Sequence, residues 1–326
     1  MATPKIACLD VLAPAVQAET RAAAPDFEIR FASRGSEEEL IDLVSDADFL
    51  LVGPAAVPAR LIAHAKRAKL IQKYGVGIEK VDIEAARRAG IAVAIAAGGN
   101  AAPVSELALA LMLAVNRRIP FGDRVTREGQ WPRTEMRESC LQLDGKTVGL
   151  YGFGAIARAT ARRLAGFDVR ILYHSRTRVD DATESALRAT YVEFDDLLAD
   201  SDILSIHVPL VPDTRHRIGA DALKLMKRNA IIVNTARGGV VDEIALHDAL
   251  ISGRLRGAGL DVYATEPPGA DNPLFSLDKV VVMPHAGGGV FDNVRKVMGH
   301  AIGNMRKLLA GEPISPADLV VAPASS

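Results

Sequence analysis

The sequence predicts an α/β protein in which parallel strands alternate with helices. Short apolar segments are separated by helix-like segments along most of the chain, a pattern typical of parallel sheets. The chain has 326 residues, which is too long for one ordinary core and enough for two domains. A glycine-rich turn opens an α/β unit in the middle of the chain, after a separate α/β unit. This order permits a cleft between two domains, where ligands of such folds usually bind.

The first half of the chain is expected to form a small α/β unit followed by a long helix. Strands are expected at residues 5–9, 27–31, 49–52, 70–73 and 92–94, with helices such as 36–44, 58–65 and 83–89 between them. After the break at Gly98-Gly99-Asn100, an apolar helix is expected at 102–118. An irregular polar segment is expected after Gly129-Gln130-Trp131-Pro132.

The second half is expected to continue the alternation. Strands are expected at residues 148–151, 169–173, 203–208, 230–234, 257–260 and 280–283. The last three are nearly uniformly apolar, which favours central positions in a parallel sheet. A helix with mixed charge is expected at 289–309, and Pro313, Pro316 and Pro323 indicate a loose tail after it.

The composition excludes several partners. Basic and acidic residues number 39 and 40, so nothing suggests a nucleic acid or a membrane surface as partner. The apolar run at 7–16 is broken by Asp10 and Pro14 and does not resemble a signal peptide. No run approaches the ~20 apolar residues of a membrane helix. Cys8 and Cys140 are too few for a disulfide framework, so we expect reduced thiols in a cytoplasmic protein.

The glycine-rich turn predicts a dinucleotide cofactor. Gly152, Gly154 and Ala157 form a G-x-G-x-x-A pattern between a predicted strand and a predicted helix. The first glycine allows the tight turn, the second lets the backbone approach a pyrophosphate, and the small third residue lets the helix pack on the strand. The expected cofactor contacts of this turn are Gly152, Phe153, Gly154, Ala155 and Ile156.

The end of the next strand favours NADP over NAD. An NAD-binding chain places Asp or Glu there for the ribose 2′-hydroxyl, whereas this chain has His174, Ser175, Arg176 and Thr177. Arg176 is available for a 2′-phosphate. NAD remains possible, because Arg176 and Arg178 could simply belong to a solvated basic loop.

Three polar segments follow predicted strands and suggest acid–base chemistry. Arg237, Glu266 and His285 each come after an apolar strand, so all three are expected at the carboxyl edge of one sheet. Arginine can hold a carboxylate and polarise a carbonyl, histidine can deliver a proton, and a carboxylate can fix the histidine tautomer. Each residue taken alone could be an ordinary surface or turn residue. Together, downstream of a dinucleotide motif, they favour a site that acts on a 2-oxo acid. No metal site is expected.

From about Lys69 to about Met305 the chain resembles the D-isomer-specific 2-hydroxyacid dehydrogenases. The motifs that carry the resemblance, besides the glycine turn and the three segments above, are Tyr74-Gly75-Val76-Gly77-Ile78, Val81-Asp82, Gly99-Asn100, Ser105-Glu106-Leu107, residues 143–149, and His207-Val208-Pro209-Leu210 with Thr214. The family implies two Rossmann-like domains with doubly wound parallel sheets and the active site in the cleft between them. It implies a flavodoxin-like substrate-binding domain at 1–98 and 290–326, a dinucleotide-binding domain at 99–289, and a homodimer.

The resemblance also implies roles for individual residues. Hydride would pass between the nicotinamide and C2 of the substrate, with Arg237 on the carboxylate and carbonyl, His285 as acid/base and Glu266 paired with His285. Val76 and Gly77 would help to hold the carboxylate. Asn100 could bind substrate or only cap the following helix. The remaining expected cofactor contacts, for several of which strand-end packing is an equally good interpretation, are His207, Val208, Pro209, Thr214, Thr235, Ala236, Asp261 and Gly287.

Two departures within the family bear on the substrate. Tyr173-His174-Ser175-Arg176 resembles the glyoxylate and hydroxypyruvate reductases that use NADPH. Phosphoglycerate-oxidising relatives commonly place Arg after the third strand, where this chain has Gly53-Pro54. We therefore expect an NADPH-dependent reductase of glyoxylate or hydroxypyruvate. The alternatives are a D-3-phosphoglycerate dehydrogenase-like enzyme and a nucleotide-sensing protein that resembles the corepressors of this superfamily.

Overall fold

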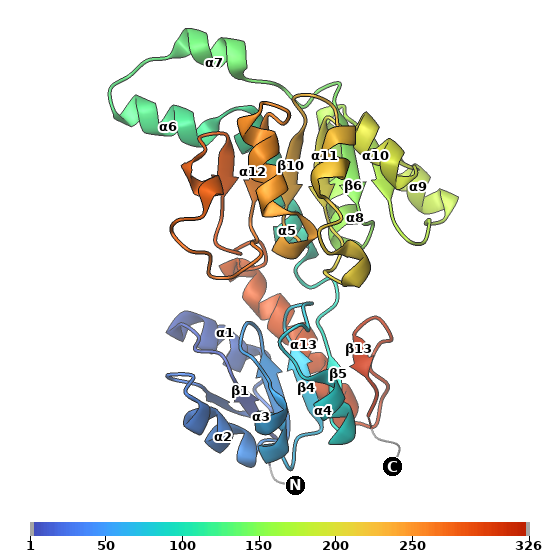
Figure 1. Ribbon diagram of the computed structural model, residues 1–326. Coiled ribbons are helices and arrows are strands. Elements are labelled where there is room, and N and C mark those ends of the chain that lie inside the picture. Colours follow the sequence, from blue (N-terminus) through green and yellow to red (C-terminus); the bar gives the residue numbers. More distant parts are fainter. Residues whose placement is uncertain (1–2, 324–326) are drawn as a thin grey trace. The chain divides into compact units, whose positions relative to one another are not determined.

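The computed structural model describes residues 3–323, which divide into two compact units. The first unit comprises the chain up to Asn100 together with the chain from Gly289 on, and the second is Ala101–Gly288 (Figure 1). The domain boundaries expected from the sequence, 98/99 and 289/290, lie within two residues of the boundaries between these units. Neither crossing point interrupts a helix or a strand of the sheets, so each unit closes its own core.

The first unit is built on a six-stranded sheet in the order β13-β5-β4-β3-β1-β2. Strands β1 to β5 are parallel to one another, and β13 runs antiparallel to β5. The strands are β1 (Lys5–Cys8), β2 (Glu28–Phe31), β3 (Phe49–Val52), β4 (Leu70–Lys73), β5 (Ala92–Ala94) and β13 (Leu319–Val321). Residues of β1, β3, β4 and β5 are almost all inaccessible, in line with their mainly apolar character, although β4 also buries Gln72 and Lys73.

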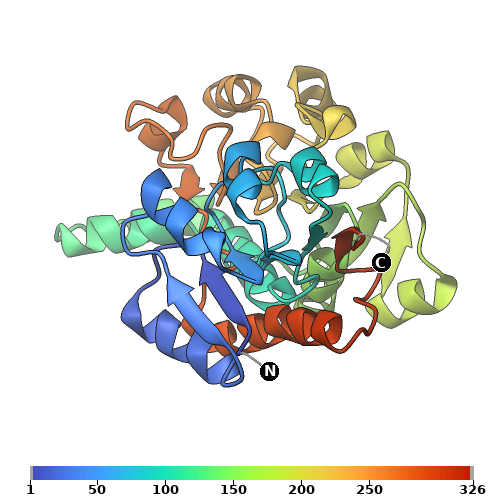
Figure 2. The ribbon, with the colours of Figure 1, turned by 90° about the horizontal axis from the view of Figure 1, so that it is seen from below.

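Helices cover both faces of this sheet. They are α1 (Pro14–Ala23), α2 (Glu37–Ser45), α3 (Ala59–His64), α4 (Ile83–Arg88) and α13 (Val294–Leu309). Leu43, Leu61 and Ala85 bring α2, α3 and α4 onto one apolar cluster. Met298 and Ala301 of α13 belong to the cluster on the other face, where α1 packs along α13 (Figure 2). The helix expected at 289–309 thus begins only at Val294, after a 3-10 turn at Phe291–Asn293.

The second unit is built on a parallel seven-stranded sheet in the order β12-β11-β10-β9-β6-β7-β8. The strands are β6 (Thr147–Tyr151), β7 (Arg170–His174), β8 (Ala189–Tyr191), β9 (Ile203–Ile206), β10 (Ile231–Asn234), β11 (Gly257–Leu260) and β12 (Val280–Val282). The chain adds β7 and β8 on one side of β6, then crosses to build β9 to β12 on the other. The turn after β6 therefore lies at the topological switch point, where dinucleotides bind in such sheets.

Two helical layers sandwich this sheet. The helices are α5 (Ala101–Asn116), α8 (Ala155–Leu164), α9 (Asp181–Leu187), α10 (Phe194–Asp200), α11 (Ala220–Leu225) and α12 (Glu243–Ile251). Leu111 of α5 and Ala157 of α8 share one core cluster, and Leu197, Leu223 and Leu246 of α10, α11 and α12 share the other. Short 3-10 turns lie at Ala165–Phe167, Pro212–Thr214, Gly238–Val240 and Pro273–Ser276.

Three expectations about the fold were wrong. The segment after Pro132 is not irregular: Arg133–Ser139 forms α7, which follows α6 (Ile119–Arg127) and buries none of its residues (Figure 1). The last strand, β12, is an edge strand with partly exposed residues rather than a central one. The tail after Pro316 is not loose, because it contains β13. Among residues 3–323, no helix is long and apolar enough to cross a membrane.

A buried carboxylate explains why the tail is ordered. Asp318 is 4% exposed and accepts hydrogen bonds from His300 Nε2 at 2.7 Å, Asn304 Nδ2 at 3.1 Å and the Ala97 amide at 3.0 Å. Burial alone would raise the pKa of Asp318, but the hydrogen bonds from these partners outweigh it and lower the pKa. The residue preceding β13 is thereby joined to α13 and to the segment after β5.

Replacing Asp318→Asn should lower the free energy of unfolding by about 1–3 kcal/mol near pH 7, because buried donors lose a charged acceptor. A carboxyl whose pKa is lower in the folded state stabilises the fold above its unfolded pKa, near 3.9 for Asp. The difference between wild type and variant should therefore shrink as the pH falls below about 4. Denaturant unfolding at pH 7 and pH 3 measures it, and an equal difference at both values would contradict this role.

Candidate active site

Three neighbouring strands bring the predicted catalytic residues to one edge of the second sheet. Strands β10, β11 and β12 are consecutive and parallel, so their carboxyl ends lie side by side. Arg237 follows β10, Glu266 follows β11 and His285 follows β12. The structure therefore brings the three segments to one edge of the sheet. Their common position after apolar strands predicted this.

The segment that carries Arg237 is held by its own strand end and by its neighbour. Asn234, 1% exposed, donates from Nδ2 to the Arg237 carbonyl at 2.9 Å and accepts from the Ala236 amide at 3.0 Å. A Cβ on Gly238 would lie 1.9 Å from the Tyr263 carbonyl carbon, so only glycine permits this approach. Arg237 is partly exposed, and its Nη1 donates to the Ala236 carbonyl at 2.6 Å. The guanidinium is thus carried on a fixed backbone.

His285 and Glu266 form a direct pair. His285 Nδ1 lies 2.6 Å from Glu266 Oε2, and the second carboxylate oxygen of Glu266 accepts from the Tyr263 amide at 3.1 Å. The imidazole is 46% exposed and the Glu266 side chain 34% exposed. With a carboxylate at Nδ1, that nitrogen carries a proton and Nε2 is left to exchange one with a ligand.

Asp261 holds the backbone beneath His285. Its side chain is buried, and its two oxygens accept from the amides of Ala286 at 2.8 Å and Gly287 at 2.9 Å. The His285 amide donates to the Asp261 carbonyl at 2.8 Å, and His285 adopts a left-handed backbone with φ of 53°. Such a conformation costs a non-glycine residue about 1–3 kcal/mol and persists only where the surroundings enforce it. Burial raises the pKa of Asp261, against the opposing effect of these amides.

The glycine turn has the features that a pyrophosphate needs. Gly152 has φ of 93°, and a Cβ there would lie 2.8 Å from the carbonyl group of His207. A Cβ on Gly154 would meet nothing within 4 Å, so the space in front of this residue is open. Helix α8 begins at Ala155 without a side-chain cap, which leaves its first amides to a ligand. Phe153 is buried, so only its backbone could face a cofactor, whereas Ala155 is exposed and Ile156 partly so.

Beyond β7, the two arginines of the basic loop differ in their contacts. Arg178 forms an ion pair with Glu184 through Nε and Nη2, both at 2.8 Å, and Glu184 also accepts from the Tyr173 hydroxyl at 2.6 Å. Arg176 is exposed and has no ion-pair partner among the residues that the structure describes. The Ser175 hydroxyl donates to the Thr177 carbonyl at 2.7 Å and shapes the turn.

His174 is fixed within an aromatic cluster. The centres of the His174 and Tyr151 rings lie 6.3 Å apart in a stacked arrangement, and the His174 ring also contacts Tyr191 and Phe194. Its Nδ1 lies 3.0 Å from the Val192 carbonyl oxygen. His207 points inward, with Nε2 2.9 Å from Ser205 Oγ, and burial lowers its pKa to about 4. His207 is partly exposed as a residue, but its Nε2 is engaged within the chain, in line with a structural role for the ring.

The remaining expected contacts fall into two groups. Thr235 Oγ1 is buried without a hydrogen-bond partner among residues 3–323, as a group awaiting a ligand would be, and the adjacent Ala236 is partly exposed. Thr214 instead uses its hydroxyl inside the chain, donating to the Pro209 carbonyl at 2.7 Å and accepting from the Val211 amide at 2.9 Å. Val208 and Pro209, which precede Thr214 in the segment after β9, are both accessible.

The expected substrate contacts belong to the first unit. Val76 and Gly77 follow β4 and are partly exposed. Asn100 Oδ1 is buried without a partner in the described chain, so it does not cap α5. The structure adds residues that sequence reasoning missed, namely Asn234, Gly238 and Tyr263. Asn234 holds the Arg237 carbonyl, Gly238 permits the close approach to Tyr263, and the Tyr263 amide donates to the Glu266 carboxylate. Of these, only the glycine pair after Arg237 gave a signal in the sequence.

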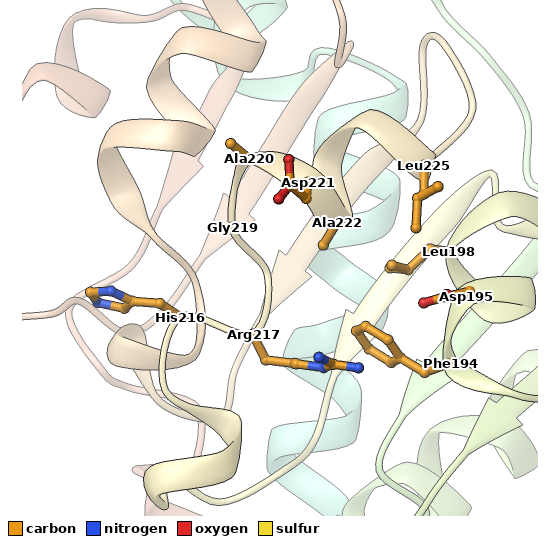
Figure 3. A pocket seen from close by; sticks show the side chains of 10 residues that line it. All are labelled: Phe194, Asp195, Leu198, His216, Arg217, Gly219, Ala220, Asp221, Ala222 and Leu225. Atoms are coloured by element: carbon orange, nitrogen blue, oxygen red, sulfur yellow. The ribbon is translucent and has the colours of Figure 1, made fainter.

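A separate cavity of about 400 Å³ lies between α10 and α11 (Figure 3). Arg217 lies 4.3 Å from the centre of the Phe194 ring at one side of it, and Asp221 and Leu225 line the other. None of the predicted catalytic or cofactor residues lines this cavity, so it carries no part of the site described above.

Comparison with known proteins identifies the family. Residues 109–287 match the model described as "D-isomer specific 2-hydroxyacid dehydrogenase, NAD binding domain". The D-3-phosphoglycerate dehydrogenase of Mycobacterium bovis is 39% identical over 313 residues, 96% of this chain, and the match spans 58% of that relative's length. The glyoxylate reductase of Thermococcus litoralis is 43% identical over 259 residues, 78% of each chain.

A solved structure extends the likeness to both units. The structure of a putative D-isomer specific 2-hydroxyacid dehydrogenase from Polaromonas superposes with a TM-score of 0.86 at 30% identity, covering 98% of this chain and 100% of the other. The expected two-domain Rossmann-like α/β fold is thereby confirmed. The chain belongs to the D-isomer specific 2-hydroxyacid dehydrogenase family.

Proposed function

We propose that the protein reduces a small 2-oxo acid, glyoxylate or hydroxypyruvate, to the D-2-hydroxy acid with NADPH. The observation that carries the proposal is the 2.6 Å pair of His285 and Glu266, next to the Arg237 segment and in the same unit as the glycine turn. An acid held by a carboxylate beside an arginine matches the needs of a substrate with an oxo group next to a carboxylate.

Arg237, His285 and Glu266 have separate roles in the proposed reaction. Arg237 binds the substrate carboxylate and polarises the carbonyl with its planar fork of donors. His285 donates a proton from Nε2 to the oxo oxygen, while Glu266 keeps the proton on Nδ1 and fixes the plane of the ring. The further residues proposed to contact the substrate are Val76 and Gly77, through backbone groups on the carboxylate, and Asn100.

The second unit has groups that fit a dinucleotide. The uncapped first turn of α8 and the open space at Gly154 would hold the pyrophosphate, and Thr235, Ala236, Asp261 and Gly287 would lie on the nicotinamide side. When bound, the nicotinamide supplies the hydride that reduces C2. Val208 and Pro209 would border the cofactor between these ends.

The preference for NADPH rests on the loop after β7. No carboxylate follows this strand directly, and Glu184 is engaged by Arg178 and Tyr173. Arg176 is left as the cation for a 2′-phosphate, with Ser175 and Thr177 beside it. Arg178 is not proposed to bind the phosphate, because its charge is already neutralised by Glu184.

The choice of substrate is supported by one relative and by one position. The T. litoralis relative is named a glyoxylate reductase, and Gly53 follows β3 without a cationic side chain. The identity to phosphoglycerate dehydrogenases keeps 3-phosphohydroxypyruvate as the second candidate substrate. A homodimer in the cytoplasm is also part of the proposal: Trp131, 80% exposed, and the unburied α7 suit a subunit contact in the second unit.

Steady-state kinetics with glyoxylate, hydroxypyruvate and 3-phosphohydroxypyruvate test the proposal. His285→Ala should lower kcat about 10²- to 10⁴-fold, because it removes the proton donor of the transition state. Arg237→Ala should also raise KM, by about 10- to 100-fold, the equivalent of the ~1.5–3 kcal/mol of charge-assisted hydrogen bonds. Failure to reduce any 2-oxo acid, or unchanged kinetics in both variants, would rule out this function. Nucleotide binding without turnover would favour the sensing alternative.

Arg176→Gln and Arg178→Gln form a matched pair for cofactor choice, since both remove one charge from the same loop. Arg176→Gln should raise KM for NADPH about 10- to 100-fold and leave KM for NADH almost unchanged. Arg178→Gln should leave the ratio of the two KM values as in the wild type. The NADPH preference is mistaken if wild type turns over faster with NADH, or if the two variants behave alike.

A further inference from the structure

The chain segments that leave β1, β3 and β4 meet at one buried carboxylate. Asp10 follows β1 and is 4% exposed. Its Oδ2 accepts from the Gly53 amide at 2.5 Å and from the Tyr74 hydroxyl at 3.0 Å, and its Oδ1 accepts from the Ala55 amide at 2.8 Å. Strands β4, β3 and β1 are neighbours in the sheet, so Asp10 ties three adjacent strand ends together.

Tyr74 occupies the space beside Gly53. A Cβ on Gly53 would lie 2.2 Å from both Cζ and the hydroxyl oxygen of Tyr74. The phenol end of Tyr74 therefore lies where a side chain at position 53 would project. Burial, followed by the charge of Asp10, raises the pKa of Tyr74, so its hydroxyl remains a neutral donor to Asp10.

Both polar groups of the Gly53 residue are held in the chain. Its amide donates to Asp10, and its carbonyl accepts from Lys73 Nζ. Lys73 is itself only 5% exposed. The turn after β3 thus has a fixed position, and the side chain of Tyr74, a partly exposed residue, packs against it. A ring held by a buried carboxylate and by a glycine backbone cannot move aside without breaking these contacts.

We propose that Tyr74 is the specificity-determining side chain of the first unit and that Asp10 is its positioning residue. Tyr74 comes two residues before Val76 and Gly77, which the proposed function assigns to the substrate carboxylate, and the inference rests on that function. The fixed phenol limits the group attached to C2 of the substrate. It admits hydrogen or a hydroxymethyl group and rejects a bulky or aromatic one.

A cycle of alanine variants tests the packing without any substrate. Gly53→Ala should lower the melting temperature by roughly 2–10 °C, as overpacking does, because its Cβ collides with the phenol. In a Tyr74→Ala background the same substitution should cost little. Gly75→Ala is the matched control, because a Cβ there meets nothing within 4 Å. Equal losses from Gly53→Ala in both backgrounds would overturn the proposed contact.

Selectivity between 2-oxo acids tests the function of Tyr74. Tyr74→Ala should raise kcat/KM for phenylpyruvate relative to glyoxylate by about tenfold or more, since an opened pocket admits the larger group. Tyr74→Leu tests the same point if the alanine variant does not fold. Tyr74→Phe keeps the ring but loses the hydrogen bond to Asp10, so it should raise this ratio, though less than Tyr74→Ala does. An unchanged ratio in Tyr74→Phe would overturn the positioning role of Asp10.

The two proposals fail in different ways. An unchanged phenylpyruvate-to-glyoxylate ratio, in variants that still reduce glyoxylate, would overturn the role of Tyr74 and leave the proposed function intact. Absence of turnover with every 2-oxo acid in wild type would overturn the proposed function, and with it the role of Tyr74 in substrate choice.

Discussion

The carboxylate of Asp261 fixes the segment on which the whole candidate site depends. It stands at the end of β11 and binds two consecutive amides of the segment that follows the neighbouring strand β12. His285 precedes these amides and has a left-handed backbone that costs free energy. Without the two charge-assisted hydrogen bonds, nothing in the local sequence of His285 would favour that conformation. Asp261, at the end of the neighbouring strand β11, therefore fixes the backbone of His285 and with it the position of His285 relative to Glu266.

Buried carboxylates at strand ends perform the same task in both units. Asp10 binds two amides of the segment after β3, as Asp261 does for the segment after β12. Burying a charge is costly, and the amide donors offset that cost while fixing a loop that apolar packing cannot hold. In both cases the carboxylate follows a strand of the parallel sheet and binds a segment that follows another strand. The segment of the proposed acid–base residue His285 is held in this way, whereas the Arg237 segment is held by the amide side chain of Asn234.

The sequence was sufficient for features that depend on local pattern. The apolar strands, the glycine turn and the order of Arg237, Glu266 and His285 along the chain follow from residue types and spacing, and the family confirms the fold. Features that depend on tertiary contacts could not be predicted. Helix α7 has no buried face and so no apolar period, and β13 is ordered by Asp318, which contacts residues far away in the chain. Asp10 looked only like an interruption of an apolar run.

The same limit applies to the site. Arg176 and Arg178 lie two residues apart in one loop, and their different surroundings, with Arg178 paired to Glu184, become visible only in the structure. Nothing in the spacing shows that Tyr74 fills the space at Gly53, because the two residues meet through neighbouring strands. Similarly, Asp261 was expected to meet the cofactor, and its hydrogen bonds to Ala286 and Gly287 give it a positioning role whether or not it also does so.

The rate of NADPH oxidation in a single turnover of Asp261→Asn with glyoxylate tests this account most directly. Asparagine has nearly the same shape, but its amide group cannot accept from one of the two N–H donors and lacks the charge. We expect hydride transfer to slow about 10- to 100-fold, as for the loss of groups that orient catalytic residues, while the variant remains folded and binds NADPH. A rate equal to that of the wild type would contradict the claim that Asp261 sets the position of His285.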